Sequence, residues 1–305
     1  MTQLLDLQEI PQAKEIYMIA GWRQWADAGN ISSGLPEYLV QLTDARKIGD
    51  IVNDGYYIFQ VPGTHHLLRP VVQLEEGYRR SLEKKRNEIF YAGNDEKGLV
   101  IFLGDEPHLN VDRYAEAFFE IVARLKVKRV AAVGGVYGSL PYDKERDISV
   151  IYSLRRLKEE LENYAVRFSN YEGGATIGAY LLDQAEAKEV EFLAMYAFAP
   201  AYDFSGERAV QTQVLRIEND FKAWYDILRR LKAMMNLGLD LSELEEQSIE
   251  LVEMMDAKID EMADELPQLE LRSYFDQLNE QYEERSFFEL GSVWEDELRD
   301  LFDDE

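Results

Sequence analysis

The sequence contains no cysteine and only three histidines among its 305 residues. Without cysteine the chain cannot form disulfide bonds, thiolate metal sites or a cysteine nucleophile, and it suits a reducing compartment. It also lacks any stretch approaching the roughly 20 apolar residues that a membrane-spanning helix needs. The first residues show neither the basic start nor the apolar run of a signal peptide. We therefore predict a cytoplasmic protein that does not enter a membrane.

Basic residues are scarce relative to acidic ones, and the imbalance is concentrated near the C-terminus. The chain has 33 lysines and arginines against 59 aspartates and glutamates, a formal net charge of −26. Residues 239–305 hold 24 acidic and 4 basic side chains, a net charge of −20, which leaves only −6 for residues 1–238. An acidic surface repels the phosphate backbone. We therefore expect no nucleic-acid partner.

The first 200 residues alternate short apolar runs with segments of helical periodicity. Helical stripes that begin at Ile31, Tyr114 and Ile177 follow three of the apolar runs, and Asn110 is placed to cap the second helix. Such alternation is typical of an α/β fold with a mostly parallel sheet, and strands that are apolar throughout are covered on both faces. The predicted core strands are Glu15–Gly21, Gly98–Gly104, Lys128–Gly134, Val166–Tyr171 and Val190–Pro200.

Two parts of the chain depart from this alternation. Within Arg46–Gly93, short β-prone pieces such as Tyr56–Phe59 and Glu88–Tyr91 indicate an antiparallel extension or a hairpin layer. After about Glu207 the strand signals stop, and three helices are predicted, with Ser242 as the N-cap of the second. These helices span Asn219–Leu237, Ser242–Leu266 and Pro267–Glu284. We divide the chain into an α/β core at 1–218, a helical extension at 219–285 and an acidic aromatic tail at 286–305.

The second of these helices has an apolar stripe and an acidic opposite face. The stripe predicts an acidic helical arm that packs on the main domain or on another subunit, while a solvated helical hairpin also explains the charges. In the tail, Phe287 and Phe288 lie among acidic residues and resemble a segment that docks in a groove of a partner or of the chain itself. The stripe consists of Leu244, Ile249, Val252, Met255, Ile259, Met262 and Leu266.

Several short motifs occur in the order found in a known protein family. They are Gly21-Trp22, Asp27-Ala28-Gly29, Gly104-Asp105-Glu106-Pro107, Arg129-Val130, Gly134-Gly135, the turn Tyr171–Ile177 and Phe198–Tyr202. Together with the acidic helical region, they resemble the bacterial-type branch of the proteasome assembly chaperone 2 family. The resemblance implies a three-layer α/β/α sandwich of nucleoside phosphorylase-like fold and a homo-oligomer such as a trimer. It also implies a role of some relatives in assembling proteasomes, and no established enzymatic activity.

Two departures from the family pattern bear on function. Many bacterial members have a proline-histidine pair after two of the strands, whereas this sequence has Pro141-Tyr142 and Pro200-Ala201. Any role of those histidines is therefore not expected here. Proteasome-binding relatives often end in a hydrophobic-tyrosine-any-residue tripeptide, whereas this sequence ends in Asp303-Asp304-Glu305. We do not expect docking through such a tripeptide.

Glycine-rich turns follow most of the predicted strands and suggest a ligand site. The carboxyl ends of parallel strands meet at one edge of a sheet, where ligands of such folds bind. The helix start after Tyr171 would offer free N–H groups to an anion. Glycine after a strand is also ordinary turn chemistry, Thr176 alone can be a helix cap, and no phosphate loop or dinucleotide fingerprint occurs. The predicted ligand-binding residues are Trp22, Asp27, Gly29, Gly134, Gly135, Glu172, Gly173, Gly174 and Thr176.

The candidate catalytic residues at this edge are Asp105, Glu106 and His108. Neighbouring carboxylates can act as acid and base when their environments separate their pKa values, and a histidine can act as a base near pH 7. Each also has a structural explanation as a cap or a loop contact. His65 and His66 lack the spacing of a helical zinc motif, and no G-x-S-x-G elbow occurs. We predict no metal site and no cofactor.

Three functions remain open on these grounds. The first is a non-catalytic, chaperone-like or scaffold protein that acts through oligomer and partner surfaces, including the acidic helices. The second is an enzyme of nucleoside-like or phosphorylated small molecules that uses the strand edge, which rests on fold analogy alone. The third is a binding module whose acidic tail docks on a receptor.

Overall fold

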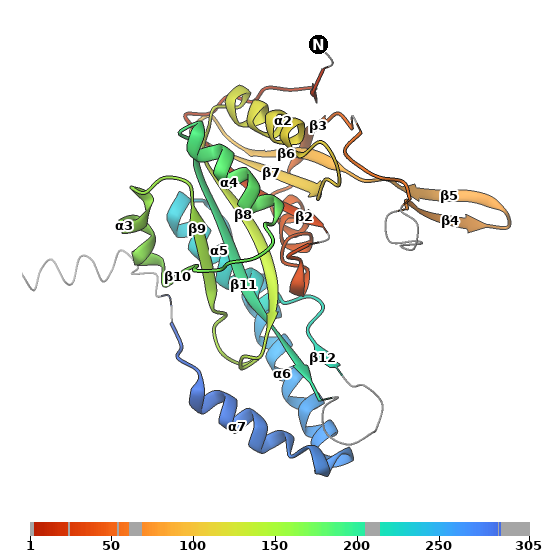
Figure 1. Cartoon of the computed structure of the whole chain (residues 1–305), viewed down its shortest axis with the longest axis vertical. Coiled ribbons are helices and arrows are strands. Elements are labelled where there is room, and N and C mark those ends of the chain that lie inside the picture. Colours follow the sequence, from red (N-terminus) through yellow and green to blue (C-terminus); the bar gives the residue numbers. More distant parts are fainter. Residues whose placement is uncertain are drawn as a thin grey trace, which may run out of the picture.

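A large β-sheet forms the centre of the protein (Figure 1). The structure, a computed structural model, describes residues 3–23, 25–53, 55–60, 69–204, 214–285 and 287. The strand order is β1-β3-β6-β7-β2-β8-β11-β9-β10, and β12 pairs with β11. The strands are β1 Leu5–Leu7, β2 Glu15–Arg23, β3 Arg46–Ile51, β6 Asn87–Gly93, β7 Lys97–Asp105, β8 Val127–Gly138, β9 Ile148–Tyr152, β10 Arg167–Phe168, β11 Glu191–Asp203 and β12 Val214–Arg216.

The middle of the sheet is parallel, as the apolar runs predicted. Strands β7, β2, β8 and β11 are parallel neighbours, which confirms four of the five predicted core strands. The fifth prediction, a parallel core strand at Val166–Tyr171, was wrong. Only the two residues of β10 pair there, at the sheet edge with β9, and β9 runs antiparallel to β11. The polar residues Ser169 and Asn170 follow at once, so this segment cannot sustain a buried strand.

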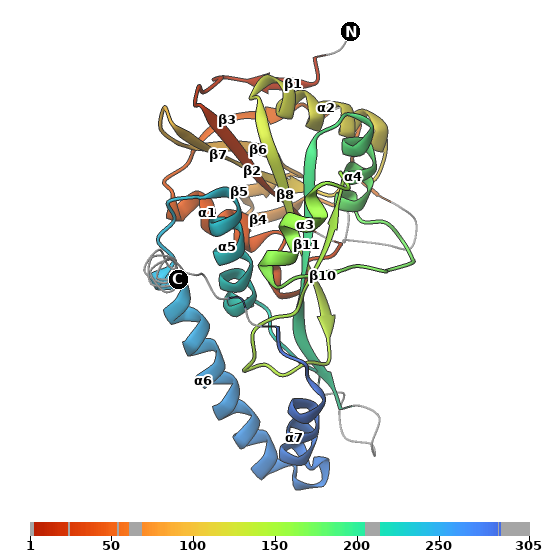
Figure 2. The ribbon, with the colours of Figure 1, turned by 90° about the vertical axis from the view of Figure 1, so that its left-hand side faces the viewer.

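Helices cover both faces of the sheet, giving the three layers of an α/β/α sandwich (Figure 2). Alternate residues of each strand point to opposite faces. Ile19 and Ile101 belong to one hydrophobic core with α1 and α5, whereas Met18 and Val100 belong to a second core with α2 and α4. The helices are α1 Gly34–Leu42, α2 Val111–Arg124, α3 Leu157–Leu161, α4 Ile177–Ala187 and α5 Phe221–Met235. Part of the segment predicted as a helical extension is therefore a core layer.

Three predicted helix caps have different outcomes. Thr176 caps α4, since its Oγ1 accepts the N–H of Ala179 at 3.1 Å. Asn110 occupies the predicted N-cap position of α2 but makes no side-chain cap: it has a left-handed φ of 54°, and its side-chain amide donates to the carbonyl of Gly55. Ser242 is not the N-cap of α6: it is the first residue of the helix, Leu241 precedes it at the N-cap position, and the N–H and hydroxyl of Ser242 both donate to Oδ1 of Asp240.

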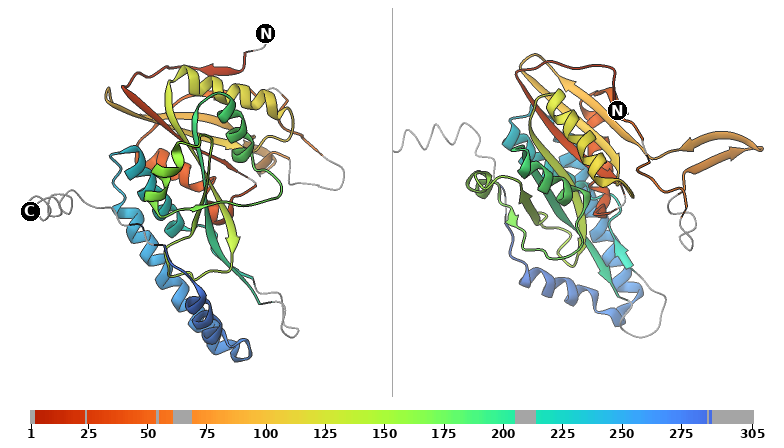
Figure 3. Two further views of the ribbon diagram at one scale, coloured as in Figure 1. Left: turned by 60° about the vertical axis from the view of Figure 1, so that its left-hand side comes forward. Right: turned by 45° about the horizontal axis from the view of Figure 1, so that its top comes forward.

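The region Arg46–Gly93 forms the predicted antiparallel extension and a separate hairpin. Strands β3 and β6 add antiparallel to the β7 edge. Strands β4 (Val71–Glu75) and β5 (Tyr78–Glu83) form a two-stranded hairpin that projects from the core (Figure 3). The β-prone segment Tyr56–Phe59 is not a strand, because the carbonyl of buried Tyr56 accepts N–H groups from the loop after β7.

The acidic helices form an arm that extends beyond the sheet (Figure 2). Helices α6 (Ser242–Glu265) and α7 (Leu271–Gln281) pack on the far ends of β11 and β12 around Tyr202. Burial of the predicted stripe is confirmed for Leu244, Met255 and Ile259, but Ile249 is 55% exposed because the buried face includes Leu251 instead. The short β12 was missed because three residues carry no pattern.

Candidate functional site

A small cavity lies at the carboxyl ends of the parallel strands. Its volume is about 20 Å³, room for about one water molecule. It is lined by Trp22, Trp25, Ala26, Ser32, Glu106, Ala132, Val133, Gly134, Thr176, Ile177, Gly178 and Tyr196. The structure thus brings four predicted site residues together: Trp22, Glu106, Gly134 and Thr176.

The chain's own groups satisfy the start of α4, where an anion site was predicted. Glu106 Oε1 accepts the N–H of Ile177 at 2.9 Å, and Thr176 Oγ1 accepts the N–H of Ala179. Thr176 also shares a 2.6 Å hydrogen bond with the hydroxyl of Tyr196. Burial raises the pKa of Glu106, although the N–H groups of Ile177 and Trp25 oppose the rise. A carboxylate of the protein therefore stands where a ligand anion would.

Asp105, the last residue of β7, is held as an ion. Its side chain is fully buried, 2.9 Å from Nε of Arg23 and 3.4 Å from Nζ of Lys85, and it accepts the N–H of Arg86 at 2.7 Å. Burial acts to raise the pKa of Asp105, but the hydrogen bonds and the two cations outweigh it and hold the pKa below its usual value. The residue suits a structural ion pair.

His108 makes contacts within its loop. Its Nδ1 accepts the N–H of Ile58 at 3.2 Å, and its ring meets that of Tyr57 edge-on at 5.6 Å. Burial and the nearby charge of Lys85 lower the pKa of His108. The histidine is therefore neutral near pH 7. His65 and His66 lie outside the described residues.

Trp22 belongs to a buried hydrogen-bond chain behind the cavity. Its Nε1 donates to the hydroxyl of Tyr114 at 2.8 Å, and that hydroxyl lies 2.8 Å from Oδ1 of Asn87. The amide of Asn87 donates to the hydroxyl of Tyr57, which lies 2.8 Å from the carbonyl of Asp105. The indole N–H of Trp22 and the hydroxyls of Tyr114 and Tyr57 therefore all have hydrogen-bond partners inside the protein.

Asp27 and two glycines shape the turn that closes the cavity. Asp27 Oδ1 accepts the N–H groups of Ser32 and Ser33, each at 2.9 Å, and so fixes the entry to α1. Gly29 has a φ of 64°. A Cβ on Gly135 would lie 2.0 Å from the carbonyl oxygen of Ala28, so only glycine permits this close approach of the turn to β8.

Glu172, Gly173 and Gly174 do not line the cavity. All three are exposed, on the segment that leads from β10 to α4. Conversely, Trp25, Ser32 and Tyr196 line the cavity without any sequence signal that marks them. Tyr196 lies inside a strand, where an aromatic residue is ordinary. A ligand-binding role for any of these residues stays a prediction.

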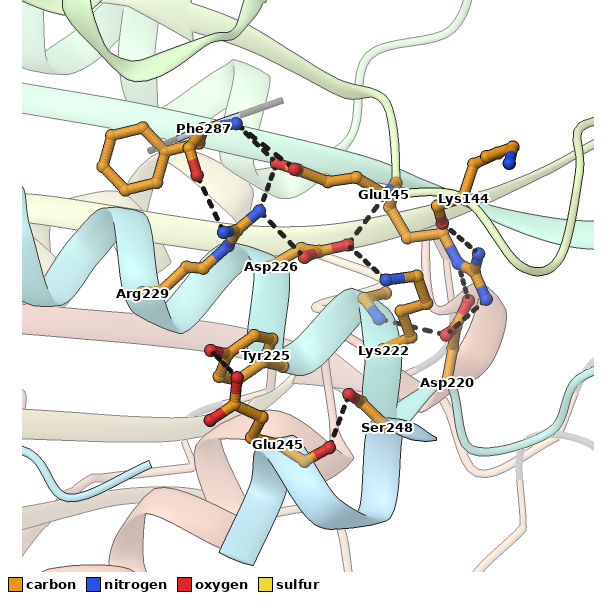
Figure 4. A network of polar contacts seen from close by, with 12 residues as sticks. Lys144, Glu145, Asp220, Lys222, Tyr225, Asp226, Arg229, Glu245, Ser248 and Phe287 are labelled. Atoms are coloured by element: carbon orange, nitrogen blue, oxygen red, sulfur yellow. Dashed lines mark hydrogen bonds and ion pairs between the residues drawn. The ribbon is translucent and has the colours of Figure 1, made fainter. Parts of the chain in front are cut away.

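A second polar cluster joins the core to the segment that follows α7 (Figure 4). Asp226 Oδ2 accepts the N–H of Arg146 at 2.8 Å, and Glu145 lies 2.5 Å from the guanidinium groups of Arg229 and Arg230. Glu145 also accepts the N–H of Phe287 at 3.1 Å. The loop between β8 and β9, helix α5 and the segment after α7 therefore meet at one network. Sequence patterns missed it because its partners are far apart in the chain.

Tyr142, at one of the positions where the family pattern has histidine, contacts the arm. Its hydroxyl donates to Oδ1 of Asp256 at 2.5 Å, and its ring meets that of Phe275 edge-on at 5.5 Å. At the other position, Ala201 pairs with Arg216 between β11 and β12. Both positions thus lie where the core supports the arm.

Two further kinds of feature, metal clusters and membrane spans, do not occur among the described residues. Within them, no group of three or more histidine, aspartate or glutamate side chains is placed to hold a metal ion. Among the described helices, none combines the length and apolar character that crossing a bilayer requires.

Comparisons with known proteins agree with this fold. Three similar solved structures come from Streptomyces avermitilis, Mycobacterium tuberculosis and Pyrococcus furiosus. The first, a PAC2 family protein, is 22% identical with a TM-score of 0.66 and covers 83% of this chain and 97% of that one. The second, a proteasome-assembly chaperone homologue, is 19% identical with a TM-score of 0.65 and covers 79% and 94%. The third, the archaeal proteasome activator PbaB, is 17% identical with a TM-score of 0.59 and covers 83% and 97%.

At these identities the structural likeness establishes the fold. A search among curated proteins found no match. The sequence itself shows which family the chain belongs to. The model of the PAC2 family matches residues 22–261, from the end of β2 into α6. The match includes the strand-edge turns, α5 and most of α6. The chain therefore belongs to the PAC2 family.

Proposed function

We propose that this protein is a non-catalytic, chaperone-like protein that acts through protein–protein contacts. The observation that carries the proposal is its membership of the PAC2 family, whose fold it shares with a proteasome-assembly chaperone homologue and a proteasome activator. Its partners, on this proposal, are subunits of a multisubunit complex such as the proteasome. We further propose that it works in the cytoplasm as a homo-oligomer.

The acidic arm is the partner surface that the structure favours. Helix α6 carries ten acidic residues and one basic residue, and only one of its faces is buried. Its exposed face presents Glu246, Glu250 and Glu253 beside the apolar side chain of Met254, which is 59% exposed. A surface of this kind suits partners with basic and apolar side chains, because opposite charges steer association and apolar contacts hold the complex.

Capture of assembly subunits by the full-length chain tests this proposal. Purified wild-type protein is crosslinked to proteasome α subunits from its own source organism, and the products are identified by mass spectrometry. Neutralising Glu246, Glu250 and Glu253 to glutamine should reduce capture about tenfold. A matched control neutralises Glu116, Glu159 and Glu186, which are exposed elsewhere. Failure of the wild type to retain any subunit would contradict the proposal.

The alternative, an enzyme of nucleoside-like or phosphorylated small molecules, is not supported. Asp105 is ion-paired, Glu106 caps a helix, and the strand-edge cavity has room for about one water molecule. We expect nucleosides, nucleotides and phosphate to leave the melting temperature unchanged. Stabilisation of the wild type that disappears in Glu106→Gln would restore the enzyme hypothesis.

A further inference from the structure

The projecting β4–β5 hairpin has no packing partner among the described elements that would explain its apolar surface. All residues of both strands are exposed except Ser81, which is half-buried. Val72 pairs with Leu82, and Leu74 lies two residues beyond Val72, so these three side chains share one face. Their exposed fractions are 50%, 38% and 63%. An isolated two-stranded hairpin is only marginally stable in water, so we expect this apolar face to bind a partner.

The hairpin is nevertheless a defined structure. Its two turn residues, Glu76 and Gly77, both have positive φ, 48° and 82°, as a tight two-residue turn between twisted strands requires. Residues 69–86, which are the two strands and the residues beside them, hold six basic and three acidic side chains, a net charge of +3 in a chain of −26; four of the basic residues flank the strands. Arg79 and Lys84 are exposed and have no ion-pair partner among the described residues.

The arm offers a complementary surface. A groove of about 540 Å³ lies between α6 and the segment from β12 to α5, with Leu215, Leu251 and Met254 among its apolar lining. The groove itself is lined by two acidic and two basic side chains, Glu218, Glu250, Arg216 and Lys258. The excess of negative charge lies beside it on α6, at Glu246, Glu250 and Glu253.

We infer that the hairpin of one copy docks on the arm of a second copy. Val72, Leu74 and Leu82 enter the groove beside Met254, while Arg79 and Lys84 face Glu250 and Glu253 on the exposed side of α6. The basic side chains of the hairpin and the acidic face of α6 carry opposite charges, and both belong to this chain. A second copy of the chain is therefore the partner that this complementarity favours. In Figures 1 and 3 the hairpin projects from the core well away from α6, so its own arm is not the occupant.

Such a contact joins different surfaces of the two copies. Contacts of this kind close into a ring when the rotation between neighbours permits it. The inference deepens the proposed function, on which it rests, by naming one partner of the acidic arm. On this inference the hairpin of a second copy and an assembly subunit compete for the same face of α6. Its test measures self-association, whereas the chaperone-like role is tested by subunit capture, so each of these two can fail without the other.

Charge reversal on each surface tests the contact. Light scattering on the full chain at roughly 10–100 µM should give the wild type a mass that is a multiple of 35.4 kDa. The double variant Arg79→Glu/Lys84→Glu and the double variant Glu250→Arg/Glu253→Arg should each weaken self-association about tenfold or more, because like charges then meet. Combining all four substitutions should restore self-association, because the hairpin is then acidic, the face of α6 is basic, and opposite charges meet again.

Matched controls reverse two charges elsewhere. Lys126→Glu/Arg155→Glu and Glu159→Arg/Glu186→Arg alter exposed residues away from both surfaces and should leave the mass unchanged. Leu74→Ser/Leu82→Ser should also weaken association, and because both side chains are exposed, its circular dichroism spectrum should match that of the wild type. A monomeric wild type, a hairpin variant of wild-type mass, or a fourfold variant that stays dissociated would overturn the inference.

Discussion

Arg146 and Asp220 form an ion pair in which neither side chain is exposed, with 2.9 Å between Nε and Oδ2. Arg146 comes from the loop between β8 and β9, and Asp220 immediately precedes α5. The Arg146 guanidinium also donates to the carbonyl oxygens of Tyr142 and Lys144, and Asp220 caps α5 by accepting the N–H of Ala223. The pair therefore fixes the loop that supports the arm to the helix layer of the core.

Removing one charge of this pair should destabilise the fold. Asp220→Asn keeps the size and the capping ability of the side chain but leaves Arg146 buried without its counterion, which costs about 3–5 kcal/mol. Urea unfolding should show this loss at neutral pH. The matched control is Arg272→Ala, which breaks an exposed pair with Asp260 and should change stability little. Equal effects of the two variants would contradict the argument.

Asp105→Asn should lower stability in a pH-dependent way. The folded protein lowers the pKa of Asp105, so this residue contributes stability that is present above about pH 3.8 and is lost as the pH falls through the folded-state value. At pH 7 the variant should lose about 1.5–3 kcal/mol, the value of a hydrogen bond to a charged group. The difference from the wild type should shrink as the pH falls below 3.8.

Glu106→Gln should show the opposite pH dependence. The folded protein raises the pKa of Glu106, so its contribution is fully present below pH 4.5 and is lost as the pH rises through the folded-state value. Glutamine keeps an acceptor for the N–H of Ile177 and carries no charge to desolvate. The variant should therefore gain stability relative to the wild type between pH 4.5 and pH 7. Urea unfolding at several pH values measures this difference in the free energy of unfolding. A difference that stays constant across this pH range would contradict the prediction.

Gly135→Ala should be costly and Gly174→Ala should not. At Gly135 the added methyl group meets the carbonyl oxygen of Ala28 at 2.0 Å, and relieving this overlap should cost about 1–3 kcal/mol. At Gly174 nothing lies within 4 Å of the added group, and its φ is not positive. Thermal unfolding of the two variants compares a tightly packed glycine with an exposed one. A ligand role of Gly135 would additionally require a ligand-dependent shift that Gly135→Ala removes.

Phe275→Ala should loosen the arm more than the core. The Phe275 ring lies 4.8 Å from that of Tyr202 and is 7% exposed, so truncation should cost about 3–5 kcal/mol. Hydrogen exchange should accelerate in α6 and α7 and remain slow in β2 and β8. The control, Phe59→Ala, removes a ring that is 63% exposed. Uniform acceleration in all these elements would show that the arm and the core open as one unit.

Local sequence patterns predicted the strands and helices whose burial follows a simple rule along the chain, such as a continuous apolar run or a helical stripe. The apolar runs of β2, β7, β8 and β11 and the stripes of their helices are examples of such patterns. The incorrect prediction of a core strand at Val166–Tyr171 shows what local patterns cannot predict. Whether a short β-prone segment lies in the middle or at the edge of a sheet depends on which strands pair with it, and these are distant in sequence. The site depends still more on distant partners: Glu106 meets Ile177, 71 residues away, and Arg146 meets Asp220, 74 residues away.

Strand β11 extends through both parts of the molecule. Its residue Met195 belongs to the core of the sheet, and Tyr202 belongs to the cluster beneath the arm. At about 3.3 Å per residue, its 13 residues span roughly 40 Å. Residues 191–200 pair continuously with β8. A force applied at the arm would therefore be transmitted along a hydrogen-bonded strand to the middle of the sheet.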